Sequence, residues 1–272
     1  MRINVNSDHY VIGKNRHKPC EDYGISGTEP IPFAILADGC SSSPGSHVGA
    51  MLLTLAARRQ IREIYHDDQP GQKLDYAAFG RSVITKASLL ARYMDLPASI
   101  LDATLMTAVY VNRQIIVYVY GDGFIIALPK ENKESRIIEI EFETNAPYYL
   151  SYLLNEERNR QYHMEKGGSK HIRRNYDTSL ILKNNEPVIY KFSADEFQTV
   201  VLASDGLGFF ADTANPERGL LPAEDVIREF TAFKNFNGEF IKRRARRAIK
   251  TYQKIGMINM DDVSTAGIHM EE

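Results

Sequence analysis

The spacing of apolar residues changes along this 272-residue chain and divides it into two kinds of segment. Helical spacing of three or four residues predicts helices over residues 47–65, 74–94, 223–232 and 236–254. Short runs rich in Val, Ile, Thr and Tyr are typical of strands. They fall at residues 3–12, 31–38, 102–111, 114–120, 123–128, 136–142, 178–183, 187–193, 198–204 and 263–270.

The order of these segments indicates an α+β fold. Strands, two helices, many strands, two helices and a last strand do not alternate as in a doubly wound fold. The turns at 112–113 and 121–123 are too short for parallel crossovers, which predicts antiparallel pairing. We therefore expect an antiparallel β core covered by helices in layers. No repeat, low-complexity tract or linker interrupts the chain, so residues 1–272 are interpreted as one domain.

Residues 143–177 are the least regular part of the sequence and are interpreted as a flap or insertion over a site. Tyrosines are frequent in this segment, and the pattern leaves open whether they pack or recognise a ligand. They are Tyr148, Tyr149, Tyr152 and Tyr162.

Composition limits the classes of function. Hydrophobic residues make up 43% and charged residues 25%, which is typical of globular proteins. The net charge of −2 argues against nucleic acid as a partner, so the basic face of the helix at 236–254 is interpreted as solvated surface. No apolar run could span a membrane, and the N-terminus lacks a signal peptide's core. Cys20 and Cys40 are too few for a disulfide framework, so we expect a reducing, cytoplasmic setting.

Two apolar runs, 33–37 and 200–203, are followed closely by an Asp-Gly pair, at Asp38 and Asp205. Carboxylates at strand ends are hydrogen-bonded or hold a cation. The other candidates are Glu21, Asp22, Asp122, Asp261 and Asp262. Taken singly, each is more typical of a turn. Taken together, oxygen ligands without a thiolate and histidine set indicate Mg²⁺ or Mn²⁺.

The order of these motifs resembles the metal-dependent serine/threonine protein phosphatases of the type-2C, or PPM, family. The resemblance covers essentially the whole chain and implies a four-layer α-β-β-α sandwich. The motifs are Glu21-Asp22, Asp38-Gly39, Gly121-Asp122, Leu202-Ala203-Ser204-Asp205-Gly206 and Asp261-Asp262-Val263-Ser264.

The resemblance also implies a role for each residue. Asp38 would bridge two Mg²⁺ or Mn²⁺ ions, with Glu21 and the Gly39 carbonyl on one and Asp205 and Asp261 on the other. Asp22 would bind a water on the metals, and Asp122 is a candidate for a third ion. The activated water would hydrolyse phosphoserine or phosphothreonine on proteins, opposing a kinase. Because adjacent strand residues face opposite sides, we expect Asp261 rather than Asp262 to point inward.

The sequence departs from the family where it would face substrate. Cys40 stands where the family often has a histidine that protonates the leaving group, and His47 is interpreted as a helix-start residue. The family's phosphate-gripping arginine lies four residues before its glutamate. That position is His17 here, and Arg16 is one residue further, so either is a candidate phosphate contact. These departures keep open an alternative, a pseudophosphatase that binds a phosphorylated partner with the same fold.

Overall fold

The computed structural model describes residues 2–10, 19–65, 75–131, 133–176, 178–213, 215, 217 and 219–271. Its α-helices are α1 (Ser46–Tyr65), α2 (Tyr76–Tyr93), α3 (Glu156–Glu165), α4 (Ala223–Thr231) and α5 (Phe240–Lys254). Short 3₁₀ helices are η1 (Ala98–Leu101), η2 (Leu150–Leu154) and η3 (Asp205–Gly208).

The strands are β1 (Arg2–Tyr10), β2 (Tyr23–Gly27), β3 (Phe33–Ala37), β4 (Leu105–Val111), β5 (Gln114–Tyr120), β6 (Gly123–Pro129), β7 (Arg136–Phe142), β8 (Ser169–Arg174), β9 (Thr178–Lys183), β10 (Val188–Ser193), β11 (Phe197–Ala203), β12 (Phe210–Asp212), β13 (Met257–Asn259) and β14 (Val263–Glu271).

Within the described residues the strands form two large sheets and one two-stranded ribbon of β12 and β13. The first sheet has the order β1-β14-β11-β6-β7-β8-β9, and the second has the order β10-β5-β4-β3-β2. Neighbouring strands in both sheets pair antiparallel, as the short turns predict.

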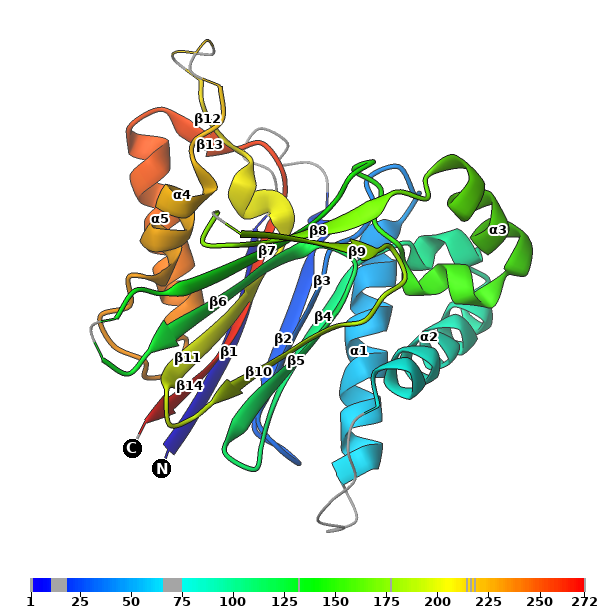
Figure 1. The fold of residues 1–272 in the computed structure, drawn as a ribbon, viewed down its shortest axis with the longest axis horizontal. Helices are drawn as coiled ribbons and strands as arrows, with labels where there is room; N and C mark the ends of the chain where they lie inside the picture. The colour runs from blue at the N-terminus through cyan, green and yellow to red at the C-terminus, as the bar shows by residue number, and fades with distance from the viewer. Residues whose placement is uncertain are drawn as a thin grey trace.

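The two sheets stack face to face, with α1 and α2 covering the smaller sheet and α4 and α5 covering the larger one (Figure 1). Three apolar clusters fill the three interfaces between these layers. Leu53 and Phe79 lie between helices and the smaller sheet, Leu36 and Ile268 between the sheets, and Phe210 and Ile241 beneath α4 and α5. The predicted four-layer α-β-β-α sandwich is confirmed.

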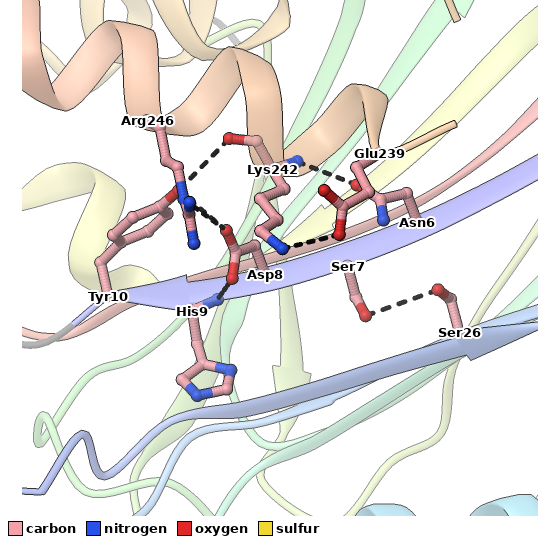
Figure 2. A network of polar contacts seen from close by, with 9 residues as sticks. All are labelled: Asn6, Ser7, Asp8, His9, Tyr10, Ser26, Glu239, Lys242 and Arg246. Carbon is pink, nitrogen blue, oxygen red and sulfur yellow. Dashed lines mark hydrogen bonds and ion pairs between the residues drawn. The ribbon is translucent and has the colours of Figure 1, made fainter. Parts of the chain in front are cut away.

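Helix α5 is fixed to the edge strand β1 by polar contacts as well as by apolar packing (Figure 2). The Lys242 backbone N–H donates to Asn6 Oδ1 at 2.9 Å, and Arg246 Nε lies 3.7 Å from Asp8 Oδ2. The Tyr10 hydroxyl donates to Asp8 Oδ2 at 2.8 Å. Arg246, a cation of the basic helix, thus contacts protein as well as solvent.

The sequence pattern did not predict every element. It predicted no strand at β2, whose residues are only half-buried and include two glycines. It indicated a flap at residues 143–177, and they contain η2, α3 and β8, the last paired on both edges within the larger sheet. Among the helices of the described residues, none combines the length and the apolar character needed to cross a bilayer.

Candidate active site

A cavity of about 360 Å³ opens where β3 and β11 end and β14 begins. Four carboxylates predicted from sequence line it: Asp38, Asp122, Asp205 and Asp261. Its remaining lining residues are Gly39, Cys40, Ser41, Ser42, Thr104, Asn145, Pro147, Tyr149 and Phe209. The structure therefore brings together side chains that lie far apart in the sequence.

Asp38 follows directly on β3, a strand in which every residue is buried. Its backbone is held on both sides by Thr104: the Asp38 N–H donates to Thr104 Oγ1 at 3.1 Å, and the Thr104 N–H donates to the Asp38 carbonyl at 2.8 Å. A buried strand with a clamped end fixes the direction in which the carboxylate points.

Gly39 is required by close packing. A Cβ at this position would lie 2.8 Å from the Glu21 carbonyl oxygen and 2.9 Å from Ser46 Cβ, so no larger residue fits. The Gly39 N–H donates to the Glu21 carbonyl, and Ser46 Oγ, at the start of α1, donates to Glu21 Oε1 at 2.9 Å. These contacts hold the Glu21 side chain beside the cavity, although Glu21 does not line it.

Asp22 is 1% exposed and is tied to the far end of the chain. Ser204 Oγ, at the end of β11, donates to Asp22 Oδ2 at 2.7 Å and accepts from the Ser264 N–H at 2.9 Å. The Ser204 N–H in turn donates to the Ser264 carbonyl. The same serine therefore positions Asp22 and joins β11 to β14.

Asp261 and Asp262 face different surroundings. Asp261 lines the cavity, whereas Asp262 Oδ2 accepts from the Glu21 N–H at 2.6 Å. The Asp262 N–H donates to Asp261 Oδ1 at 2.8 Å. Asp262 thus anchors the segment that carries Glu21, and Asp261 is left to face the cavity.

Asp122 occupies the turn between β5 and β6, between two glycines with φ of +107° and +123°. Residues with side chains rarely adopt such angles, so Gly121 and Gly123 are needed for this turn. A Cβ on Gly123 would also lie 2.6 Å from the Ala203 carbonyl oxygen, at the end of β11. This close approach brings Asp122 next to Asp205.

Mutual repulsion and burial perturb the acids of this cluster. Burial, with the charges of Asp22 and Asp205, raises the pKa of Asp38 well above its usual range. Burial raises the pKa of Asp22 to about 7 and that of Asp261 to about 6. Burial also raises the pKa of Asp205, and burial together with the charge of Asp205 raises that of Asp122. Either proton uptake or a bound cation would relieve this repulsion.

The donor set suits a hard divalent cation, because all of its candidate ligands are oxygens. Two buried carboxylate oxygens, Asp22 Oδ1 and Asp205 Oδ1, have no hydrogen-bond partner. Buried polar atoms are rarely left in this state. Across the described ranges, no group of three His, Cys, Asp or Glu side chains is arranged so that it could hold an ion directly.

The two candidate phosphate contacts, Arg16 and His17, lie outside the described residues. The structure adds residues that the sequence analysis did not assign to the site. Thr104 and Ser204 hold Asp38 and Asp22, and Tyr149 lines the cavity. Ser204 belongs to the Leu202-Ala203-Ser204-Asp205-Gly206 motif, and Tyr149 is one of several tyrosines in residues 143–177, whereas Thr104 carried no sequence signal.

Cys40 also lines the cavity, with its Sγ 3.0 Å from Ser42 Oγ. The position of Cys40 is fixed by its N–H, which donates to the Asp102 carbonyl at 2.9 Å. A thiol therefore occupies the cavity wall where the resemblance led us to expect a histidine.

Comparison with known proteins gives the same family. A sequence model of the family described as protein phosphatase 2C matches residues 14–247. No curated protein sequence matches the chain.

Solved structures resemble the fold over nearly its whole length. The Mycobacterium tuberculosis serine/threonine phosphatase PstP/Ppp has a TM-score of 0.55 and 18% identity, with 99% of each chain covered. Stp1 from Staphylococcus aureus has a TM-score of 0.56 and 12% identity, covering 100% of this chain and 96% of its own. The PstP catalytic domain in complex with two manganese ions has a TM-score of 0.51 and 17% identity, with 99% and 100% covered. At these identities the likeness is one of fold.

Proposed function

This chain belongs to the protein phosphatase 2C family, and on that premise we propose that it is a metal-dependent phosphomonoester hydrolase acting on phosphoserine or phosphothreonine in proteins. The observation that carries the proposal is the convergence of four carboxylates on one cavity, beside two buried carboxylate oxygens that lack partners. Such a cluster is costly unless it binds cations.

We assign the metal ligands to Glu21, Asp38, the Gly39 carbonyl, Asp205 and Asp261, with Asp122 as ligand of a third ion. Asp38 would serve two Mg²⁺ or Mn²⁺ ions, a role supported by its place in the same cavity wall as Asp205 and Asp261. Bound divalent ions would neutralise the phosphoryl oxygens and lower the pKa of the attacking water.

The remaining residues orient the reactants. Asp22 Oδ2 is held by Ser204, which leaves Oδ1 free to accept a hydrogen bond from the attacking water. Arg16 or His17 would bind the phosphate. Cys40, a weak acid near neutral pH, would favour substrates whose leaving group needs little protonation.

The substrate side of the proposal follows from the family. The partner would be a phosphorylated protein, its phosphate added by a serine/threonine kinase in the cytoplasm. The part of residues 143–177 that precedes β8 would act as a flap within a single domain, since Asn145, Pro147 and Tyr149 line the cavity.

The test is hydrolysis of para-nitrophenyl phosphate and of a phosphothreonine peptide with Mn²⁺, with and without chelator. We expect chelation to abolish both activities. Hydrolysis of para-nitrophenyl phosphate but not of the peptide would show that protonation of the leaving group limits the reaction. If folded, Mn²⁺-loaded protein hydrolyses neither substrate, the proposed enzymatic activity is refuted and the pseudophosphatase is favoured. The observation that supports this alternative is the thiol of Cys40 in the cavity wall.

A further inference from the structure

A hollow of about 140 Å³ lies between the start of α5 and the segment that joins α4 to α5. We call it the basic hollow. Its lining residues are Ala232, Phe233, Lys234, Asn235, Phe240, Arg243, Arg244 and Arg247. Four of these eight described residues are cationic, and none is Asp or Glu. None of them lines the candidate active site.

The other face of α5 treats its cations differently (Figure 2). Lys242 Nζ lies 2.6 Å from Glu239 Oε1, and Arg246 pairs with Asp8 on β1. On this side of α5 both cations therefore have a carboxylate partner. The cations of α5 are therefore not all fully solvated.

The cations of the basic hollow are held in place but incompletely neutralised. Arg244 is paired with Glu229 at 2.5 Å, and only 11% of its side chain is exposed. Arg243 Nη1 and Nη2 donate to the carbonyls of Asn237 and Asn235, both at 3.1 Å, which orients the guanidinium without cancelling its charge.

The side chains of Lys234 and Arg247 have no hydrogen bond or ion pair within the described part of the chain. Arg243 and Arg247 are four residues apart, so two like charges share one helix face, which is unfavourable without an anion between them. The N-cap of α5 is the acid Glu239, but its carboxylate pairs with Lys242 and does not line the hollow.

We propose that the basic hollow binds a single phosphate group. Guanidinium groups match phosphate oxygens with paired N–H donors, and lysine supplies a point charge. The volume of the hollow suits one such group rather than a polyanion, and the net charge of −2 disfavours a polyanion surface. The phosphate is either free inorganic phosphate or the phosphoryl group of a phosphopeptide. This site does not depend on the proposed catalytic function.

The first experiment titrates inorganic phosphate into the full chain by calorimetry in the presence of chelator at fixed ionic strength. Chelation leaves the acidic active site without cations, so it repels the anion and the basic hollow is reported alone. We expect saturable binding that the double variant Lys234→Gln/Arg247→Gln weakens at least tenfold. Lys250→Gln, which removes an exposed cation of α5 outside the hollow, should leave affinity within twofold.

Further arms separate the sources and the alternatives. Arg247→Lys keeps the charge but loses the planar donors, so we expect an intermediate affinity. Binding of a phosphoserine peptide but not of free phosphate, with the same dependence on Lys234 and Arg247, would identify a tethered phosphoryl group. The proposed site would be overturned if Lys250→Gln reduced the phosphate affinity as much as Lys234→Gln/Arg247→Gln does. It would also be overturned if the protein preferred RNA to phosphate or bound neither phosphate probe saturably.

Discussion

Arg158 on α3 forms an ion pair with Asp102, a residue just before β4 that is 6% exposed. Replacement of this arginine tests how the segment beside the candidate active site is held in place. Arg158 Nη2 donates to Asp102 Oδ1 and Oδ2 at 3.0 and 2.8 Å. Ser43 Oγ and Ser151 Oγ donate to the same carboxylate at 3.2 and 2.5 Å. One buried charge thus joins η2 and α3 to the loop after Asp38.

Arg158→Met removes the only cation of this cluster within the described residues and leaves two hydroxyl donors on Asp102. Removal of one partner from a buried pair costs about 3–5 kcal/mol. Because 30% of the Arg158 side chain is exposed, water can replace part of the interaction, and we expect a loss of about 2–3 kcal/mol. For a chain of this size the melting temperature should fall by about 4–12 °C.

The assay is thermal and urea unfolding of Arg158→Met, Asp102→Asn and the double variant. Arg160→Met, which removes an exposed arginine of the same helix, serves as control. The double-variant cycle should give a coupling free energy well above that of an exposed ion pair. A loss below about 1 kcal/mol in Arg158→Met, or equal to that of Arg160→Met, would refute the reasoning, because exposed pairs contribute no more than that.

Three further predictions follow from other parts of the structure. His269 is buried against Phe236, and burial lowers its pKa to about 4. The protein should therefore lose up to about 3 kcal/mol of stability as the pH falls from 6.5 to 4. His269→Gln should flatten the dependence of the unfolding free energy on pH in this range, and an unchanged slope would contradict the assignment. Gly49→Ala would place a Cβ 1.7 Å from the Ile100 carbonyl oxygen, so the free energy of unfolding should fall by at least about 1–3 kcal/mol. A free energy of unfolding within about 0.5 kcal/mol of the wild type, which is the scatter of surface substitutions, would contradict the packing. Cys40→His should raise hydrolysis of a phosphoserine peptide at least about tenfold relative to para-nitrophenyl phosphate, since general-acid catalysis contributes 10²–10⁴-fold; an unchanged ratio would show that position 40 does not protonate the leaving group.

The parts of the fold that could be predicted are those where the local pattern of apolar and polar side chains determines which residues are buried. The buried strand at 33–37 and the Asp-Gly pair after it fix both the strand and the direction of Asp38. The stripe of apolar residues on α5 likewise predicts its buried face, with Ile241 and Ala248 in the core.

The parts that could not be predicted depend on distant partners. The basic sequence of β8 becomes an inner strand because β7 and β9 pair with both of its edges. Lys170 of this strand is 2% exposed, and its Nζ donates to the Glu186 carbonyl at 2.6 Å. The hydroxyl that holds Asp22 comes from Ser204, 182 residues away. Ser204 stands in the motif that follows β11, but no local pattern shows that its hydroxyl reaches Asp22.

The measurement that tests the central claim most directly is calorimetric titration of Mn²⁺ into the wild-type chain and into Asp38→Asn and Asp205→Asn. Asp225→Asn, at an exposed acid of α4, is the matched control. We predict saturable binding of two Mn²⁺ ions to the wild type and to Asp225→Asn. Asp38→Asn and Asp205→Asn should each weaken it at least about tenfold, because each removes a charged oxygen ligand. Mn²⁺ binding that is absent from the wild type, or unchanged when Asp38 and Asp205 are replaced, would contradict the assignment of this carboxylate cluster as a metal centre.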